Sequence, residues 1–78
     1  FWVTYPNPVH DRLFLNPIIS DTALSYQIFT SEGRYIRKGK LSFETAYPSI
    51  DLSMLNKGIY LIKLNNGTQS EVKKILKA

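Results

Sequence analysis

The sequence predicts an all-β domain: a small antiparallel β-sandwich, immunoglobulin-like, with six or seven strands. Short runs of alternating apolar and polar residues recur along the chain, with turn residues about every 8 to 12 positions, as is typical of such sandwiches. Hydrophobic residues make up 44% of the 78 residues, which is enough for a folded core. No segment shows the periodicity of a helix longer than one turn.

The composition excludes several kinds of site. The chain has no cysteine, so it has no disulfide, no thiolate metal site and no cysteine nucleophile. No apolar run approaches the roughly 20 residues of a membrane-spanning helix. The first residues do not form a signal peptide, and we expect Phe1 to be an internal cut in a larger protein. The formal net charge is +4, and we interpret the cations of residues 34–40 and 73–77 as solvated charges that protect sheet edges, rather than as a site for an anionic partner.

The chain begins with a short apolar stretch, residues 1–4, which is either the end of a linker or a first short strand. Tyr5-Pro6-Asn7-Pro8 follows as a stiff lead-in, because proline fixes φ and lacks the N–H that a central strand requires. The next alternating run predicts a strand with Leu13 and Leu15 on one face. Val9 is expected to pack beneath this strand.

A hairpin is predicted after a polar break. Its first strand alternates from Leu24 to Phe29, and Gly33 marks the turn. The return strand, from Arg34 to about Phe43, carries Ile36 as its inward residue. Gly39 is expected to form a bulge or a bend in that strand.

The organising stretch of the chain is residues 50–64, which predicts a strand, a tight turn and a longer strand. Alternate residues from Tyr60 to Leu64 form a wholly apolar face, so the longer strand is predicted to be central and buried on that face. In the turn, Ser53 is expected to cap a single helical turn, and Gly58 is expected to adopt positive φ.

The last hairpin turns at Asn65-Asn66-Gly67. A two-residue loop would place Val72 opposite Leu61, whereas a three-residue loop would place Val72 opposite Tyr60 on the core face, and we favour the three-residue loop. Asn66-Gly67-Thr68 also matches a glycosylation acceptor, but the turn alone explains these residues.

The inward positions of these strands define the expected core: Leu13, Leu15, Ile28, Ile36, Ile50, Leu52, Leu55, Tyr60, Ile62 and Val72. The sequence has no cluster of residues that could form a catalytic or metal site. His10 is the only histidine, whereas zinc needs three or four ligands. The carboxylates are scattered, and the glycines mark turns rather than a phosphate-binding loop. The sequence therefore predicts no catalytic residue, no cofactor and no metal.

A series of motifs follows one another along residues 5–78: Tyr5-Pro6-Asn7-Pro8-Val9; Asp11 with Leu13 and Leu15; Tyr26-Gln27-Ile28-Phe29 before Gly33-Arg34; Ile50-Asp51-Leu52-Ser53 with Leu55; Gly58-Ile59-Tyr60; and Lys73-Lys74-Ile75-Leu76-Lys77. In this order and spacing they resemble the type A C-terminal sorting domain of the type IX secretion system, also called the Por secretion system. The resemblance covers residues 5–78 and leaves residues 1–4 as linker or first strand. Thr30 departs from the family pattern, which often has an acidic residue there.

The resemblance implies a non-catalytic signal at the C-terminal end of a larger cargo in the same polypeptide. It implies transit through the periplasm, recognition by the shuttle proteins and translocon of the type IX system, and export to the cell surface or the extracellular space. A sortase-like peptidase then typically removes the domain. No cofactor, nucleic acid or membrane span is implied. The residues that family motifs associate with translocon recognition are Gly58, Tyr60, Lys73, Lys74 and Lys77, although each also has a structural explanation.

Two other functions remain open. A carbohydrate- or protein-binding sandwich appended to a secreted enzyme would share the fold, with Trp2, Phe14 or Phe29 as an exposed aromatic platform. A nucleic-acid binder would need basic and aromatic residues alternating on one exposed face, whereas Tyr26 and Tyr60 are expected to face the core.

Overall fold

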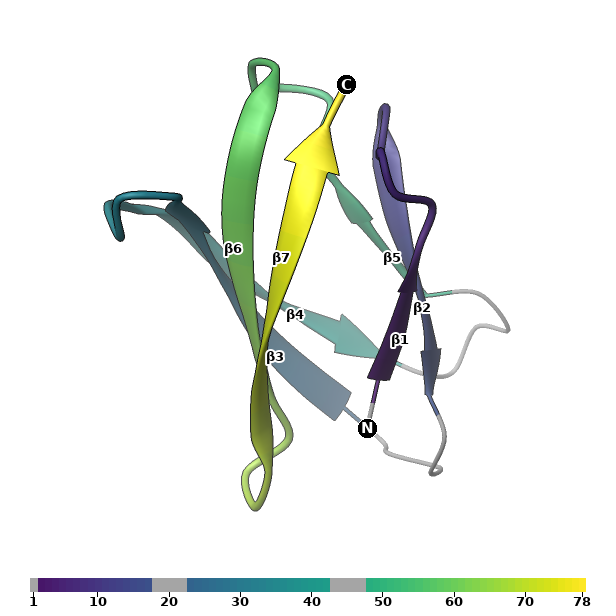
Figure 1. Cartoon of the computed structure of the whole chain (residues 1–78). Coiled ribbons are helices and arrows are strands. Elements are labelled where there is room, and N and C mark those ends of the chain that lie inside the picture. Colours follow the sequence, from purple (N-terminus) through teal and green to yellow (C-terminus); the bar gives the residue numbers. More distant parts are fainter. Residues whose placement is uncertain (1, 18–22, 43–47) are drawn as a thin grey trace.

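The protein is a sandwich of two antiparallel sheets (Figure 1), as the sequence predicts. The structure is a computed structural model that describes residues 2–17, 23–42 and 48–78. The three-stranded sheet has the order β1-β2-β5 and the four-stranded sheet the order β4-β3-β6-β7. None of the described segments is a helix long and apolar enough to cross a membrane. The strands are β1 (Trp2–Tyr5), β2 (Arg12–Pro17), β3 (Ala23–Thr30), β4 (Tyr35–Ser42), β5 (Ser49–Asp51), β6 (Gly58–Asn65) and β7 (Ser70–Lys77).

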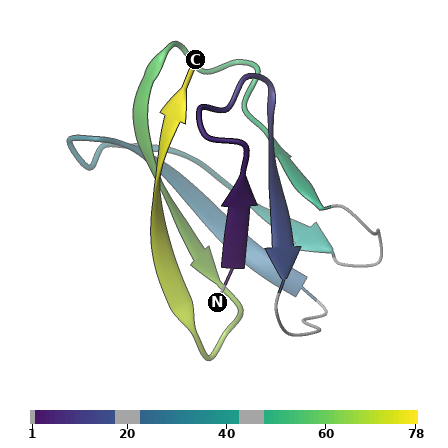
Figure 2. The same ribbon diagram turned by 45° about the vertical axis from the view of Figure 1, so that its right-hand side comes forward.

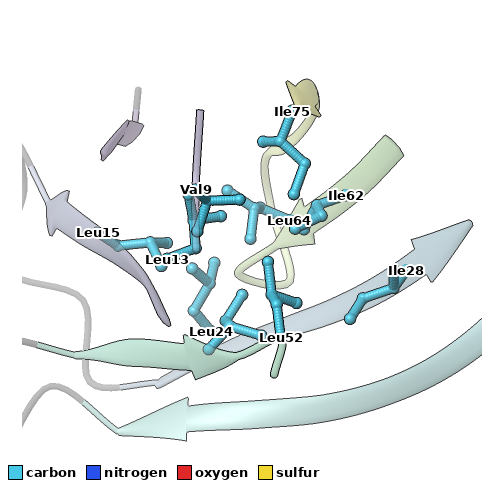
Figure 3. Close-up of a cluster of buried hydrophobic side chains, with 10 residues drawn as sticks. Val9, Leu13, Leu15, Leu24, Ile28, Leu52, Ile62, Leu64 and Ile75 are labelled. Carbon is cyan, nitrogen blue, oxygen red and sulfur yellow. The ribbon is translucent and has the colours of Figure 1, made fainter. Parts of the chain in front are cut away.

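A hydrophobic core fills the space between the sheets (Figure 3). Leu55 and Tyr60 are half-buried and pack against it, so most of the predicted core is confirmed. The predicted strand end at Phe43 lies outside the described residues. The buried apolar residues are Val9, Leu13, Leu15, Leu24, Ile28, Ile50, Leu52, Ile62, Leu64 and Ile75.

Strand β6 is central, as its alternation predicts. It pairs with β3 on one side and with β7 on the other. Ile62 and Leu64 are buried on its inner face. Gly58 begins the strand with a φ of 153°, which confirms the positive φ expected at this corner.

Strand β4 contains a bulge that the sequence did not indicate. Ile28 pairs with Arg37 and Phe29 pairs with Tyr35, which leaves Ile36 as the extra residue. Ile36 is 36% exposed, so its predicted core position is wrong. Because the bulge shifts the alternation by one residue, Arg37 takes the inner position. Its Nη2 donates a hydrogen bond of 2.6 Å to the main-chain oxygen of Asp51 and so links the two sheets.

Gly39 does not form the predicted bulge or bend. It pairs in regular register with Tyr26 in β3. A Cβ atom at Gly39 would lie only 2.5 Å from the Tyr26 hydroxyl oxygen and 2.6 Å from the adjacent ring carbon. The glycine is therefore required because the Tyr26 ring lies across it.

We expect Gly39→Ala to lower the free energy of unfolding by about 1 to 3 kcal/mol, because the Tyr26 ring must move. In a Tyr26→Ala background the same change should be within about 0.5 kcal/mol of neutral. Urea unfolding of the four proteins measures both effects. An equal cost of Gly39→Ala in both backgrounds would show that the ring is not the reason for the glycine.

The last hairpin has a different register from the predicted one. Val72 lies opposite Lys63, and Ile75 lies opposite Tyr60. Val72 is 58% exposed and Ile75 only 2%, so the predicted core position of Val72 is wrong and Ile75 occupies the core instead. The predicted three-residue loop is too short, because Asn65 pairs with Ser70 and leaves four residues between them.

The longer loop, residues 66–69, is held by two asparagine side chains. The Oδ1 of Asn65 accepts a hydrogen bond from Gly67 N at 2.6 Å. The Oδ1 of Asn66 accepts from Thr68 N at 3.0 Å and from Gln69 N at 2.7 Å. These bonds stabilise a four-residue turn, and they account for the Asn66-Gly67-Thr68 sequence as a turn.

The turn after β5 is capped by Asp51 rather than by Ser53. Leu55 N donates to Leu52 O at 3.0 Å, which closes a β-turn instead of the expected helical turn. Ser53 N donates to Asp51 Oδ1 at 3.0 Å. This main-chain bond, followed by a bond from the Ser53 side chain, lowers the pKa of Asp51 below its ordinary value of 3.8.

The lowered pKa of Asp51 predicts a pH dependence of stability. Folding favours the carboxylate, so its contribution is complete above the ordinary pKa of 3.8 and is lost as the pH falls through the lower folded pKa. The free energy of unfolding should therefore fall less steeply below this pH in Asp51→Asn than in the parent. Urea unfolding across the acid range tests this, with Asp11→Asn as a charge-matched control. Identical acid slopes in the parent and Asp51→Asn would contradict the prediction.

Candidate recognition site at the last strand

The residues carried over from the family motifs lie on two neighbouring strands. In the pairing of β6 with β7, Gly58 is opposite Lys77, while Lys73 and Lys74 are opposite Ile62 and Leu61. Directly paired residues project from the same face of a sheet. Lys73 therefore shares the inner face with the buried Ile62, whereas Lys74 is on the opposite face. The structure brings these residues together along the strands but not onto one surface.

The three lysines of β7 have different environments. Lys77 is only 7% exposed, and its Nζ donates to the main-chain oxygen of Ala78 at 3.3 Å. Lys73 Nζ lies 3.1 Å from Glu71 Oε1, and this hydrogen bond is the main cause of a lowered pKa for Glu71. Lys74 is exposed. Lys74 is solvated, as the interpretation of edge charges requires, but that interpretation is wrong for the buried Lys77 and the half-buried Arg37.

Gly58 and Tyr60 stabilise the conformation of the chain at the start of β6. The Tyr60 hydroxyl donates to Asn56 O at 2.8 Å and so ties the strand to the preceding loop. A Cβ atom at Gly58 would have Tyr60 Cε2 at 3.9 Å, which is ordinary contact. The positive φ, rather than crowding, is therefore what favours glycine there.

The end of β7 is covered by the segment Asn7–Val9, which lies beside it (Figure 2). Leu76 N donates to Asn7 Oδ1 at 3.1 Å, and Val9 N donates to Leu76 O at 2.8 Å. Ala78 N in turn donates to Val9 O at 2.8 Å. No local pattern in the sequence predicts this role, because these partners are up to 69 residues apart in the chain.

The earlier part of β7 remains an open edge. Since Leu76 directs its N–H and C=O away from β6, alternation places the same groups of Lys74 and Val72 on that side. Across the described residues, no main-chain hydrogen bond reaches Val72 or Lys74 from this side. Strand β7 thus combines a closed end with outward main-chain groups at Val72 and Lys74 that pair with no described strand.

Comparison with known protein families shows to which family this chain belongs. The sequence model described as "Secretion system C-terminal sorting domain" matches residues 3–78. The chain belongs to this family. The match confirms the resemblance found in the sequence, and a sorting-signal domain of this kind is not a catalytic module. No curated protein matches the chain.

The sorting domain offers little that resembles a catalytic or metal centre. No group of three or more His, Cys, Asp or Glu residues that could hold a metal occurs within residues 2–17, 23–42 and 48–78. His10 is exposed to solvent. A shallow hollow of about 180 Å³ beside the closed end of β7 is lined by Asn7, Ile59, Lys74, Ile75 and Leu76.

We expect Asn7→Ala to loosen the closed end of β7. The Leu76 amide loses its acceptor, so its hydrogen exchange should accelerate by about tenfold, with a loss of about 0.5 to 1.5 kcal/mol in the free energy of unfolding. Exchange monitored by NMR measures this site directly. Asn56→Ala is the matched control, because it keeps the main-chain oxygen that Tyr60 uses. Unchanged exchange at Leu76 would show that the Asn7 bond does not protect this edge.

Proposed function

We propose that this sorting domain directs a larger cargo, which precedes it in the same polypeptide, across the outer membrane by the type IX secretion system. The cargo passes through the periplasm and reaches the cell surface or the extracellular medium. The shuttle proteins and the translocon recognise the domain, and a sortase-like peptidase then removes it. The family match over residues 3–78 is the observation that carries this proposal.

The proposed recognition element is the open edge of β7 at Val72 and Lys74. A partner strand can pair with the free main-chain groups of Val72 and Lys74, a common mode of peptide recognition. The exposed Lys74 would then help to select the partner. Gly58, Tyr60, Lys73 and Lys77 would act by holding β7 in shape, because they are half-buried or buried.

The alternative of an aromatic binding platform has less support. Phe14 stacks on Tyr5 with ring centroids 5.8 Å apart, and Phe29 contacts the edge of Tyr35 at 5.9 Å. Phe14 alternates with buried residues of β2, and Phe29 with buried residues of β3, so the two project from the outer faces of opposite sheets. They cannot form one platform. The side chain of Trp2 lies outside the described residues.

The test is a fusion of a signal peptide, a fluorescent reporter and residues 3–78 in cells that have the type IX machinery. The reporter should appear outside the cell, and deletion of Lys74–Ala78 should leave it in the periplasm. Periplasmic retention of a correctly folded parent fusion would refute the sorting function.

A single substitution separates strand pairing from folding. Val72→Pro removes an N–H that faces the open edge, a position where an edge strand tolerates proline. We expect the variant to fold but to lose export, whereas Val72→Thr should be exported normally. Circular dichroism and melting temperature check the fold of both variants. If folded Val72→Pro is exported as well as the parent, β7 is not recognised by strand pairing.

A further inference from the structure

The four-stranded sheet presents one large surface that contacts neither the core nor the three-stranded sheet. It is the face of the four-stranded sheet that is turned away from β1, β2 and β5 (Figure 1), here called the outer face. Its residues alternate with the buried residues of the same strands, or lie directly opposite such positions. They include Ser25, Gln27, Phe29, Tyr35, Lys38, Lys40, Ile59, Leu61, Lys63, Asn65, Ser70, Val72, Lys74 and Leu76.

One half of the outer face is mostly apolar, with Lys74 opposite Leu61 as its one cation. The strand register places Tyr35, Phe29 and Leu61 side by side across three strands, and Ile59 beside Leu76 in the adjacent row. Tyr35, Ile59 and Leu76 are between 42% and 50% exposed. Contiguous apolar side chains on a folded surface commonly mark an interaction site.

The other half is basic. Lys38 and Lys63 both lie opposite Gln27, and Lys40 lies opposite Ser25. These three lysines are exposed. None of the outer-face residues is acidic, and no ion pair between these lysines and a carboxylate occurs within the described parts of the chain. The positive charge is therefore not neutralised by neighbouring residues of this face.

The basic half also has room for a ligand group. An open hollow of about 400 Å³ is lined by Ser25, Tyr26, Gln27, Lys38, Gly39 and Lys40. A second hollow, of about 270 Å³, shares Ser25 and Lys40 and extends to the 65–67 turn. A carboxylate in either space would lie near a lysine and the Ser25 side chain.

We propose that the outer face binds an acidic segment of a partner protein. Apolar side chains of the partner would pack on the apolar half of this face, and its carboxylates would pair with Lys38, Lys40 and Lys63. Charge complementarity selects the acidic partner. The face of a β-sheet is a surface onto which helices and sheets of proteins pack. The proposal rests on the proposed sorting function in placing this partner in the export machinery. It goes further because it names a second surface, distinct from the open edge of β7.

The test uses the reporter fusion with two charge-matched double variants. Lys40→Glu with Lys63→Glu places acid on the outer face, whereas Arg12→Glu with Lys57→Glu makes the same charge change elsewhere. Like-charge repulsion should lower export by about tenfold or more in the first variant only. Melting temperatures close to the parent value establish that both variants fold, and Lys40→Gln with Lys63→Gln should have an intermediate effect.

A photo-crosslinking amino acid at Gln27 identifies the occupant in exporting cells. We expect a crosslink to an acidic protein segment, lost in the Lys40/Lys63 variant and restored when carboxylates of that segment are changed to lysine. A probe at exposed Ser53 should not give this crosslink. Purified domain is also mixed with vesicles of phosphatidylcholine with or without phosphatidylglycerol. Binding to the anionic vesicles, together with crosslinks to lipid alone, would overturn the proposal.

The outcomes distinguish the two hypotheses. If the parent fusion is not exported, the sorting function fails. If the parent and the Lys40/Lys63 variant are exported equally and Gln27 gives no protein crosslink, the outer-face proposal fails while the sorting function stands.

Discussion

The hydrogen bonds between the Asn7–Val9 segment and β7 are the constraint on which the rest of this sandwich depends. They join the start of the three-stranded sheet to the edge of the four-stranded sheet, far apart in sequence. Arg37 makes a second link between the sheets through Asp51. With no cysteine to cross-link the chain, these polar contacts and the apolar core hold the layers together.

Strand β7 separates structural from exposed roles by simple alternation. Ile75 and Lys77 are buried on its inner face, while Val72, Lys74 and Leu76 are exposed on the other. The main chain is divided in a different way. Its last residues pair with β6 and with the Asn7–Val9 segment, whereas the outward groups of Val72 and Lys74 pair with none of the described strands. Loss of export after a change at Lys77 would therefore be expected from altered packing alone, whereas a change at Lys74 reports on a surface contact.

The outer face and the open edge meet at Lys74, whose side chain belongs to the first and whose main chain belongs to the second. A partner that pairs with β7 would extend the four-stranded sheet and enlarge the outer face next to Lys74. The small size of the domain makes such surfaces a large share of the molecule. A non-catalytic signal of this kind can thus present two distinct contacts from a single sheet.

Local sequence determined the fold class, the central position of β6 and most of the core, because alternation within a strand decides which residues share a face. Tertiary structure decided the phase of that alternation. A bulge at Ile36 turned Arg37 inward. The Asn65 and Asn66 side chains stabilise a longer loop, which shifts the register so that Ile75 instead of Val72 lies in the core. The burial of Lys77 beside Val9 could not be predicted from the sequence either, because a contact between segments so far apart leaves no periodic pattern in either segment.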